Sequence, residues 1–145
     1  MIAVDTNLLV YAHREDLPWH SAAAERLISL AESRDRWGIP WPCAHEFFAK
    51  VTHPRIFARP SSAADALAFI AELSRSPTLQ FLAETDDYWS LLERIVKSSR
   101  VVGPMIHDAR IAALCVLHGV SELWSADRDF GRFSQLRVRN PLIAD

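Results

Sequence analysis

The feature that most constrains the fold of this chain is a regular alternation between short apolar segments and longer segments of helical periodicity. The short runs have the length and character of buried strands and cover residues 2–4, 39–41, 78–82, 122–125 and 136–139. Between them, apolar side chains recur at helical spacing over residues 8–11, 18–35, 43–51, 63–74, 86–98 and 107–117. Strands that alternate with helices favour right-handed crossovers and a mostly parallel sheet. We therefore predict one α/β domain over residues 1–145, with a central sheet of four to five strands covered by helices on both faces.

Residues that start and stop helices set the expected boundaries. Gly38 is expected to interrupt the pattern just before the second strand. Ser61 and Ser62 can cap the helix that follows them, and Pro77 lies beyond its end. Residues 127–133 are expected to form a turn or a short helix between the last two strands.

Length and composition exclude several classes of protein. The chain has 145 residues, of which 50% are hydrophobic, and a net charge of −2, so it can bury one core and is not disordered. No stretch approaches the roughly 18 apolar residues that span a bilayer, and the first residues carry no basic leader. Cys43 and Cys115 match no metal spacing and are expected to be buried free thiols. We therefore expect a soluble, unexported protein of the cytoplasm, without a membrane partner.

Acidic residues stand where the active site of an α/β protein is expected. Asp5 ends the first strand, Asp127 follows the fourth, and Glu46 lies in the first turn of the helix after the second. Asp108 opens the helix that leads into the fourth strand, and Asp129 lies two residues beyond Asp127. Each acid also has a structural interpretation, since it could cap a helix, favour a helix dipole or lie in a solvated turn. Their joint placement predicts that they meet at one edge of the sheet.

Several carboxylates at one edge repel one another unless a cation lies between them. Mg²⁺ and Mn²⁺ prefer oxygen ligands, and such ions can activate water for phosphodiester hydrolysis. The six histidines form no zinc motif such as HExxH, and no GxxxxGK loop is present for a nucleotide. The acids therefore predict a hard divalent cation, with Mg²⁺ first and Mn²⁺ as the other candidate.

Four motifs follow one another along nearly the whole chain: Val4-Asp5-Thr6-Asn7-Leu8-Leu9-Val10-Tyr11-Ala12, Glu46-Phe47 with Thr52-His53-Pro54-Arg55, His107-Asp108-Ala109-Arg110-Ile111-Ala112-Ala113, and Trp124-Ser125-Ala126-Asp127-Arg128-Asp129-Phe130. Together they resemble the PIN-domain ribonucleases, and more narrowly the VapC toxins of bacterial toxin–antitoxin systems. The resemblance implies a three-layer α/β/α domain of PIN type. It also implies a Mg²⁺- or Mn²⁺-dependent endoribonuclease that is inhibited by a cognate antitoxin and acts on RNA such as tRNA, rRNA or mRNA.

The resemblance also assigns roles to residues. The catalytic acids of the family fall on Asp5, Glu46, Asp108 and Asp127, with Asp129 as an additional metal-site acid and Thr6, Asn7 and Ser125 as supporting polar side chains. We hypothesise that Asp5 and Asp108 hold the principal metal directly. Glu46 and Asp127 would complete its shell, hold a second ion or orient the attacking water, so that no covalent enzyme intermediate is needed.

RNA must be bound beside this acidic edge, and 14 of the 16 basic residues are arginine, which suits phosphate recognition. Candidate contacts, each of which could instead be ordinary surface, are Lys50, Arg55, Arg59, Arg128 and Arg132, with Arg137 and Arg139 nearby. Tryptophans could stack on bases, although Trp124, in a strand, is expected in the core. The apolar N-terminal helices predict a homodimer and an antitoxin helix docked in an apolar groove.

Other functions remain open at this stage. A haloacid dehalogenase phosphatase needs a second acid two residues after Asp5, where this chain has Asn7. A receiver-type signalling domain needs a lysine after a late strand, and neither Lys50 nor Lys97 lies there. The chain could also be an RNA-processing PIN nuclease without an antitoxin, or a PIN domain kept as a non-catalytic scaffold.

Overall fold

The computed structural model describes residues 1–144 and contains a five-stranded parallel sheet in the order β3-β2-β1-β4-β5. Ala3 of the central strand pairs with Gly38 on one side and Leu123 on the other. The strands are β1 Ile2–Val4, β2 Trp37–Pro40, β3 Leu79–Leu82, β4 Glu122–Trp124 and β5 Val138–Arg139. The predicted parallel sheet is confirmed.

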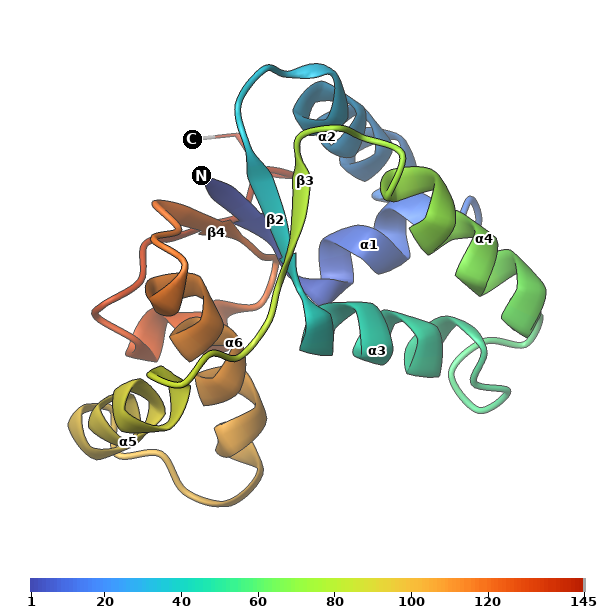
Figure 1. Cartoon of the computed structure of the whole chain (residues 1–145). Helices are drawn as coiled ribbons and strands as arrows, with labels where there is room; N and C mark the ends of the chain where they lie inside the picture. The colour runs from blue at the N-terminus through green and yellow to red at the C-terminus, as the bar shows by residue number, and fades with distance from the viewer. Residues whose placement is uncertain (145) are drawn as a thin grey trace.

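Helices cover both faces of this sheet, with α1 to α4 on one side and α5 and α6 on the other (Figure 1). The α-helices are α1 Thr6–His13, α2 His20–Glu32, α3 Trp41–Val51, α4 Ala63–Leu73, α5 Tyr88–Ser98 and α6 Ile106–Leu117. Two short 3₁₀ helices, η1 Gly103–Met105 and η2 Arg128–Arg132, precede α6 and follow β4. The predicted three-layer α/β/α arrangement is therefore present, and the predicted turn or short helix after residue 127 is η2.

The buried side chains explain why these segments fold as they do. Trp37, Phe47 and Phe130 are among the largest fully buried side chains, and Trp124 and both cysteines are buried as predicted. The Ser62 side chain accepts a hydrogen bond from the backbone N–H of Asp65, which confirms this residue as the cap of α4.

The second strand corrects one expectation. Gly38 does not interrupt the pattern before a strand at residues 39–41, because it lies within β2. A Cβ atom at this position would come within 3.1 Å of a Leu82 side-chain carbon, so glycine lets β2 and β3 pack closely. Trp41 begins α3 instead of ending the strand, since Pro42 stands in the first turn, where a missing N–H costs nothing.

The strand order places the switch in winding direction between β1 and β4, where ligands of such sheets bind beyond the carboxyl ends of the strands. The chain runs outward from β1 through β2 to β3, then returns to β4 on the other side of β1. Asp5 directly follows β1, and Ser125 directly follows β4. Within residues 1–144, no helix has the length and apolar character needed to cross a membrane.

Candidate metal centre

Three aspartates bring carboxylate oxygens together at this end of the sheet. Asp108 lies in the first turn of α6, Asp127 directly precedes η2, and Asp129 lies in the first turn of η2. One carboxylate oxygen from each lies within 4.8 Å of the others. None of the ion pairs between described residues involves these three side chains. Within residues 1–144, therefore, none of these ion pairs balances the charge of the cluster.

Asp5 lies beside this cluster as a buried carboxylate with several donors. Its Oδ2 atom accepts hydrogen bonds from the Ser125 hydroxyl at 2.7 Å and from the Asn7 amide at 3.0 Å. The Cys43 thiol lies 3.5 Å from Oδ1 as a weak donor. Asp5 occupies the capping position of α1, yet its side chain caps nothing. The capping interpretation of Asp5 is therefore wrong, and its Oδ1 atom is the oxygen with the weaker partner.

Glu46 approaches from the other side, on α3. Its Oε2 atom accepts a hydrogen bond from the Thr6 hydroxyl at 2.9 Å, and its Oε1 atom lies 3.3 Å from the Lys50 ammonium. Glu46 and Asp108 line the same hollow, of about 430 Å³, between α3 and α6. Thr6, which lies 40 residues before Glu46 in the chain, thus holds the Glu46 carboxylate toward the edge where the aspartates meet.

The electrostatics of Asp108 connect all five acids. Burial, and after it the negative charges of Asp127, Asp5, Glu46 and Asp129, raises the pKa of Asp108 above its ordinary value of 3.8. Burial likewise raises the pKa of Asp5, although the hydrogen bond from Ser125 opposes the shift. A cation bound beside Asp108 and Asp5 would stabilise their ionised forms and so oppose both shifts.

The supporting residues tie the loops after β1 and β4 together. Besides Asp5, the Asn7 amide contacts Ser125 Oγ at 3.2 Å, and its Oδ1 atom accepts the Ala126 backbone N–H at 3.0 Å. Ser125 Oγ also accepts the Asp127 N–H at 3.0 Å. The structure thus places Thr6, Asn7 and Ser125 next to the acids, as the sequence predicted.

Two of the structural alternatives can be judged directly. The Asp127 side chain does cap η2, because it accepts the Asp129 N–H at 2.9 Å, so the turn interpretation of these residues is partly right. Asp108 makes no capping bond at the start of α6, where Met105 holds the cap position. The contact of Cys43 with Asp5 was missed from the sequence, which shows only a thiol among apolar residues.

The candidate RNA contacts fall into two regions. Arg128 lines a second hollow, of about 410 Å³, together with Ser125 and Asp127. Arg132 lies nearby, with a guanidinium nitrogen 3.0 Å from the sulfur of Met105. Lys50 pairs with Glu46 itself, as described above. These three cations border the acids, as expected of residues that could bind an RNA strand there.

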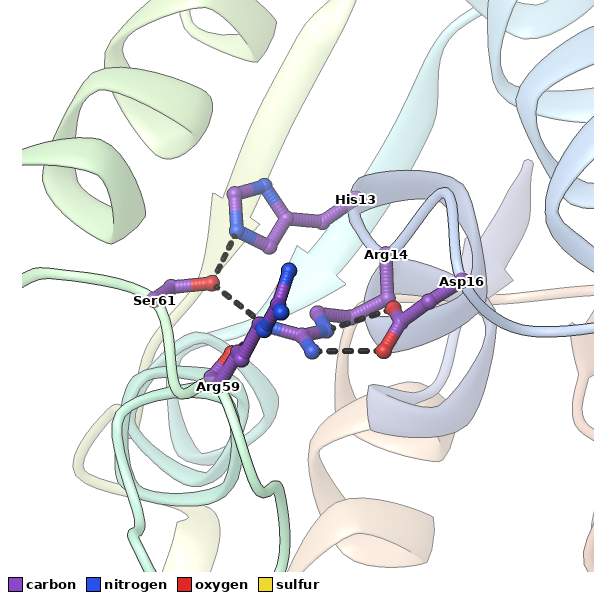
Figure 2. Close-up of polar contacts among 5 residues, drawn as sticks. All are labelled: His13, Arg14, Asp16, Arg59 and Ser61. Carbon is purple, nitrogen blue, oxygen red and sulfur yellow. Dashed lines mark hydrogen bonds and ion pairs between the residues drawn. The ribbon is translucent and has the colours of Figure 1, made fainter.

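Arg55 and Arg59 lie instead in the exposed loop between α3 and α4. A buried arginine at the end of α1 holds that loop (Figure 2): Arg14 donates to the Arg59 carbonyl at 2.7 Å and pairs with Asp16 at 2.7 Å. Nothing in these contacts joins Arg55 or Arg59 to the acids, so their role toward RNA stays a prediction.

The donor set suits Mg²⁺ or Mn²⁺ more than a soft metal. The group of three that can offer atoms to one ion consists of carboxylates, and no histidine or cysteine belongs to it among the described residues. Hard divalent cations take oxygen ligands of this kind. The residues therefore fit such an ion, with Asp108, Asp127 and Asp129 as the most closely grouped donors.

Comparison with known proteins agrees with this architecture. Residues 2–136 match the family model described as PIN domain. The chain is 35% identical over 142 residues to "VapC ribonuclease Mb2897" of Mycobacterium bovis, covering 98% of this chain and 96% of that relative. Among solved structures it is similar to VapBC2 from Rickettsia felis bound to a promoter DNA fragment (TM-score 0.70, 15% identity, 96% of this chain and 98% of the other). A second similar structure is Mycobacterium tuberculosis VapC20, described as a Sarcin-Ricin loop cleaving toxin (TM-score 0.64, 19% identity, 94% and 99% coverage).

Proposed function

This chain belongs to the PIN domain family and is related to VapC ribonucleases over nearly its full length, and from that premise we propose that it is a metal-dependent endoribonuclease. It acts as the toxin of a toxin–antitoxin pair and hydrolyses RNA phosphodiester bonds. The observation that carries the proposal is the meeting of Asp5, Glu46, Asp108, Asp127 and Asp129 at the switch point of the sheet, without a base to neutralise the central three.

The acids have different roles at the proposed site. Asp108, Asp127 and Asp129 would hold a Mg²⁺ or Mn²⁺ ion, and Asp5 can offer its Oδ1 atom to the same site. When bound, such an ion supplies positive charge beside the scissile phosphate and a water of lowered pKa. Glu46 lies across the hollow from Asp108 and orients the attacking water through a carboxylate oxygen. Ser125 and Asn7 hold Asp5 in one orientation by donating to its Oδ2 atom.

The test is cleavage of a fluorescently labelled single-stranded RNA by the purified chain. Cleavage is expected with Mg²⁺ or Mn²⁺ and not with EDTA. The Asp108→Asn variant keeps the shape of the side chain but loses its charge, and we expect its rate to fall more than about 100-fold, because several kcal/mol of metal stabilisation is lost at tenfold per 1.4 kcal/mol. Asp35→Asn is the matched control, since Asp35 is exposed and lies just before β2, at the opposite end of the strands. Full activity of Asp108→Asn would refute the assignment.

An apolar groove favours an antitoxin partner over an independent RNA-processing role. The groove holds about 490 Å³ between α2 and α4 and is lined by Leu27, Ile28, Phe69 and Leu73, with Ile28 55% exposed. An amphipathic helix of the partner would bury this surface. If a small protein is encoded beside this gene, its co-expression with the chain should give a stable, inactive complex, and Ile28→Glu should release active nuclease. An active, unbound wild-type chain under the same conditions would instead support the processing role.

A second apolar groove favours a homodimer. It holds about 510 Å³ between α3 and α4, is lined by Trp41, Phe48 and Ile70, and lies beside Leu67, which is 61% exposed. Sedimentation should give twice the chain mass, and Leu67→Glu should give the monomer. The two buried free cysteines suit the reducing cytoplasm, where we propose that the protein acts.

A further inference from the structure

One arginine absent from the sequence-based set of RNA contacts lies in the same hollow as the acids. Arg110 lines the hollow between α3 and α6 together with Glu46 and Asp108, one turn along α6 from His107. Because Asp108 and Arg110 both line this hollow, a ligand that fills it lies beside both side chains. In the sequence this position belongs to the motif around Asp108, but nothing there indicates that its side chain shares a hollow with Glu46.

The Arg110 side chain is held in place by an acid from another element. Its Nε and Nη2 atoms donate to Glu84 Oε1 at 2.8 and 2.6 Å, and Glu84 lies just after β3. The Arg110 side chain is 39% exposed, and its Nη1 atom is not used by Glu84. A guanidinium has five N–H donors, so this one keeps donors for a further anion while Glu84 fixes its orientation.

The acids lie between two hollows, and each hollow contains an arginine. Glu46 and Asp108 line the first hollow with Arg110, whereas Asp127 lines the second with Arg128. An RNA strand repelled by five carboxylates needs cations on its phosphates at either side of the scissile bond. Lys50, on the first side, pairs with Glu46, one of the five acids, whereas Arg110 pairs with Glu84, which lies outside them.

We propose that Arg110, oriented by Glu84, binds a substrate phosphate next to the scissile one, in the hollow between α3 and α6. The proposal rests on the proposed ribonuclease function, because it assigns the anion to the RNA strand that the acids cleave. Arg110 then contributes to substrate binding and to the path of the strand, with Arg128 on the other side of the acids. A phosphate contact of this kind reads no base, so its effect is the same for every RNA sequence.

The experiment measures binding of a labelled single-stranded RNA by fluorescence anisotropy in EDTA, at several salt concentrations, and KM for cleavage in Mg²⁺. Arg110→Gln should weaken binding and raise KM about tenfold, and it should reduce the slope of log affinity against log salt by about 0.7, the value for one phosphate contact on a single strand. Arg110→Lys should restore most of the slope. Arg75→Gln is the matched control, since Arg75 is exposed and also pairs with a glutamate, Glu72, but lies on the far groove between α2 and α4.

Glu84→Gln separates phosphate binding from a merely structural role. It removes the charge of the partner but keeps a side-chain oxygen that can accept from Arg110, and it leaves the Arg110 charge in the hollow, so RNA binding should be kept or strengthened. The proposal is overturned if Arg110→Gln matches Arg75→Gln in affinity, slope and KM, or if Glu84→Gln reproduces the losses of Arg110→Gln. These outcomes are independent of the proposed function, which fails instead if Asp108→Asn cleaves RNA at the wild-type rate.

Discussion

At the scale of single residues, the buried carboxylate of Asp5 depends on a small set of donors. Ser125 contributes the shortest of these hydrogen bonds and also accepts the Asp127 N–H, so one hydroxyl positions two of the acids. Asp5 is only 4% exposed, and burial raises its pKa despite this bond. The Ser125 hydroxyl therefore favours the ionised form of Asp5 against the effect of burial and fixes its orientation.

Ser125→Ala tests this dependence. We expect the free energy of unfolding to fall by about 1.5–3 kcal/mol, since a hydrogen bond to a buried charged group is lost. RNA cleavage should fall about 10- to 100-fold, as is typical when the partner of a metal ligand is removed. Ser125→Thr keeps the hydroxyl and should retain most of both properties, and Ser134→Ala, at an exposed serine, is the control. Unchanged cleavage in Ser125→Ala would show that Asp5 needs no such support.

Asp5 and Asp127 follow strands whose carboxyl ends lie at the same edge of a parallel sheet, so their approach could be predicted from the order of the elements. Glu46 and Asp108 lie within helices, and their approach to this edge depends on how α3 and α6 pack. Partners such as Cys43 and Glu84 could not be predicted, because their contacts depend on which side chains two packed elements turn toward each other. Only coordinates show that the Cys43 thiol meets Asp5 or that Glu84 meets Arg110.

At the scale of elements, the loop between α3 and α4 is fastened to the end of α1. Arg14 is 8% exposed and donates to the Arg59 carbonyl and to Ser61 Oγ (Figure 2). Its guanidinium carbon also lies 4.1 Å from the centre of the Phe57 ring. Asp16 pairs with the guanidinium from the solvent side. This one side chain therefore joins an otherwise exposed loop to the layer of helices.

Arg14→Ala should loosen this loop. We expect the free energy of unfolding to fall by about 2–3 kcal/mol, because charged hydrogen bonds and a cation–π contact are lost. Limited trypsin digestion should cut after Arg55 faster than in the wild type. Arg14→Lys keeps the charge but lacks the planar set of guanidinium donors, so its stability and cutting rate should lie between those of Arg14→Ala and the wild type. Arg26→Ala, on the exposed face of α2, should change neither the free energy of unfolding nor the cutting rate. Equal cutting rates in Arg14→Ala and wild type would contradict the tether.

The packing of α1 against α3 and α4 gives the protein a pH dependence through His13. Its ring contacts Phe47 and Phe69, and burial, then the charge of Arg14, lowers its pKa below the ordinary value of 6.5. Asp65 opposes the shift and His20 adds to it. Below pH 6.5 the unfolded chain takes up a proton that the folded protein does not, so stability falls as the pH drops toward the lowered pKa.

Urea unfolding at pH 8 and pH 5.5 measures this effect. The wild type should lose more stability between the two values than His13→Gln, which has no proton to gain at this position. His53→Gln, at an exposed histidine, should behave as the wild type does. A loss in His13→Gln as large as that of the wild type would assign the pH dependence to other groups.

The boundary of a helix could be predicted from the sequence where one residue caps it through a local hydrogen bond. Ser62 caps α4 through its own hydroxyl, and that local contact is visible in the sequence. The expectation for Gly38 is wrong because glycine is needed there for close packing. The Leu82 side chain approaches this position from β3, about 40 residues later in the chain. Local signals thus fix the caps, whereas the start of β2 depends on tertiary packing.

At the scale of the whole molecule, the net charge of −2 conceals an uneven distribution. Five acids gather at the switch point between β1 and β4, and the rest of the chain carries more bases than acids. Under the proposed function, a divalent ion at the acids and arginines in the hollows on either side would attract an anionic strand to this end of the sheet. The apolar groove between α2 and α4 shares no lining residue with the hollow between α3 and α6, whereas the groove between α3 and α4 shares His45 with it.

The central claim is that these acids form one cation site on which RNA cleavage depends. The most direct measurement is a titration of the purified protein with Mn²⁺, followed by electron paramagnetic resonance of the free ion and by RNA cleavage in the same samples. The account predicts that cleavage rises in proportion to bound Mn²⁺, that Asp35→Asn behaves as the wild type does, and that Asp108→Asn loses binding and cleavage together. Cleavage without bound metal, or Mn²⁺ binding by Asp108→Asn with wild-type affinity, would contradict it.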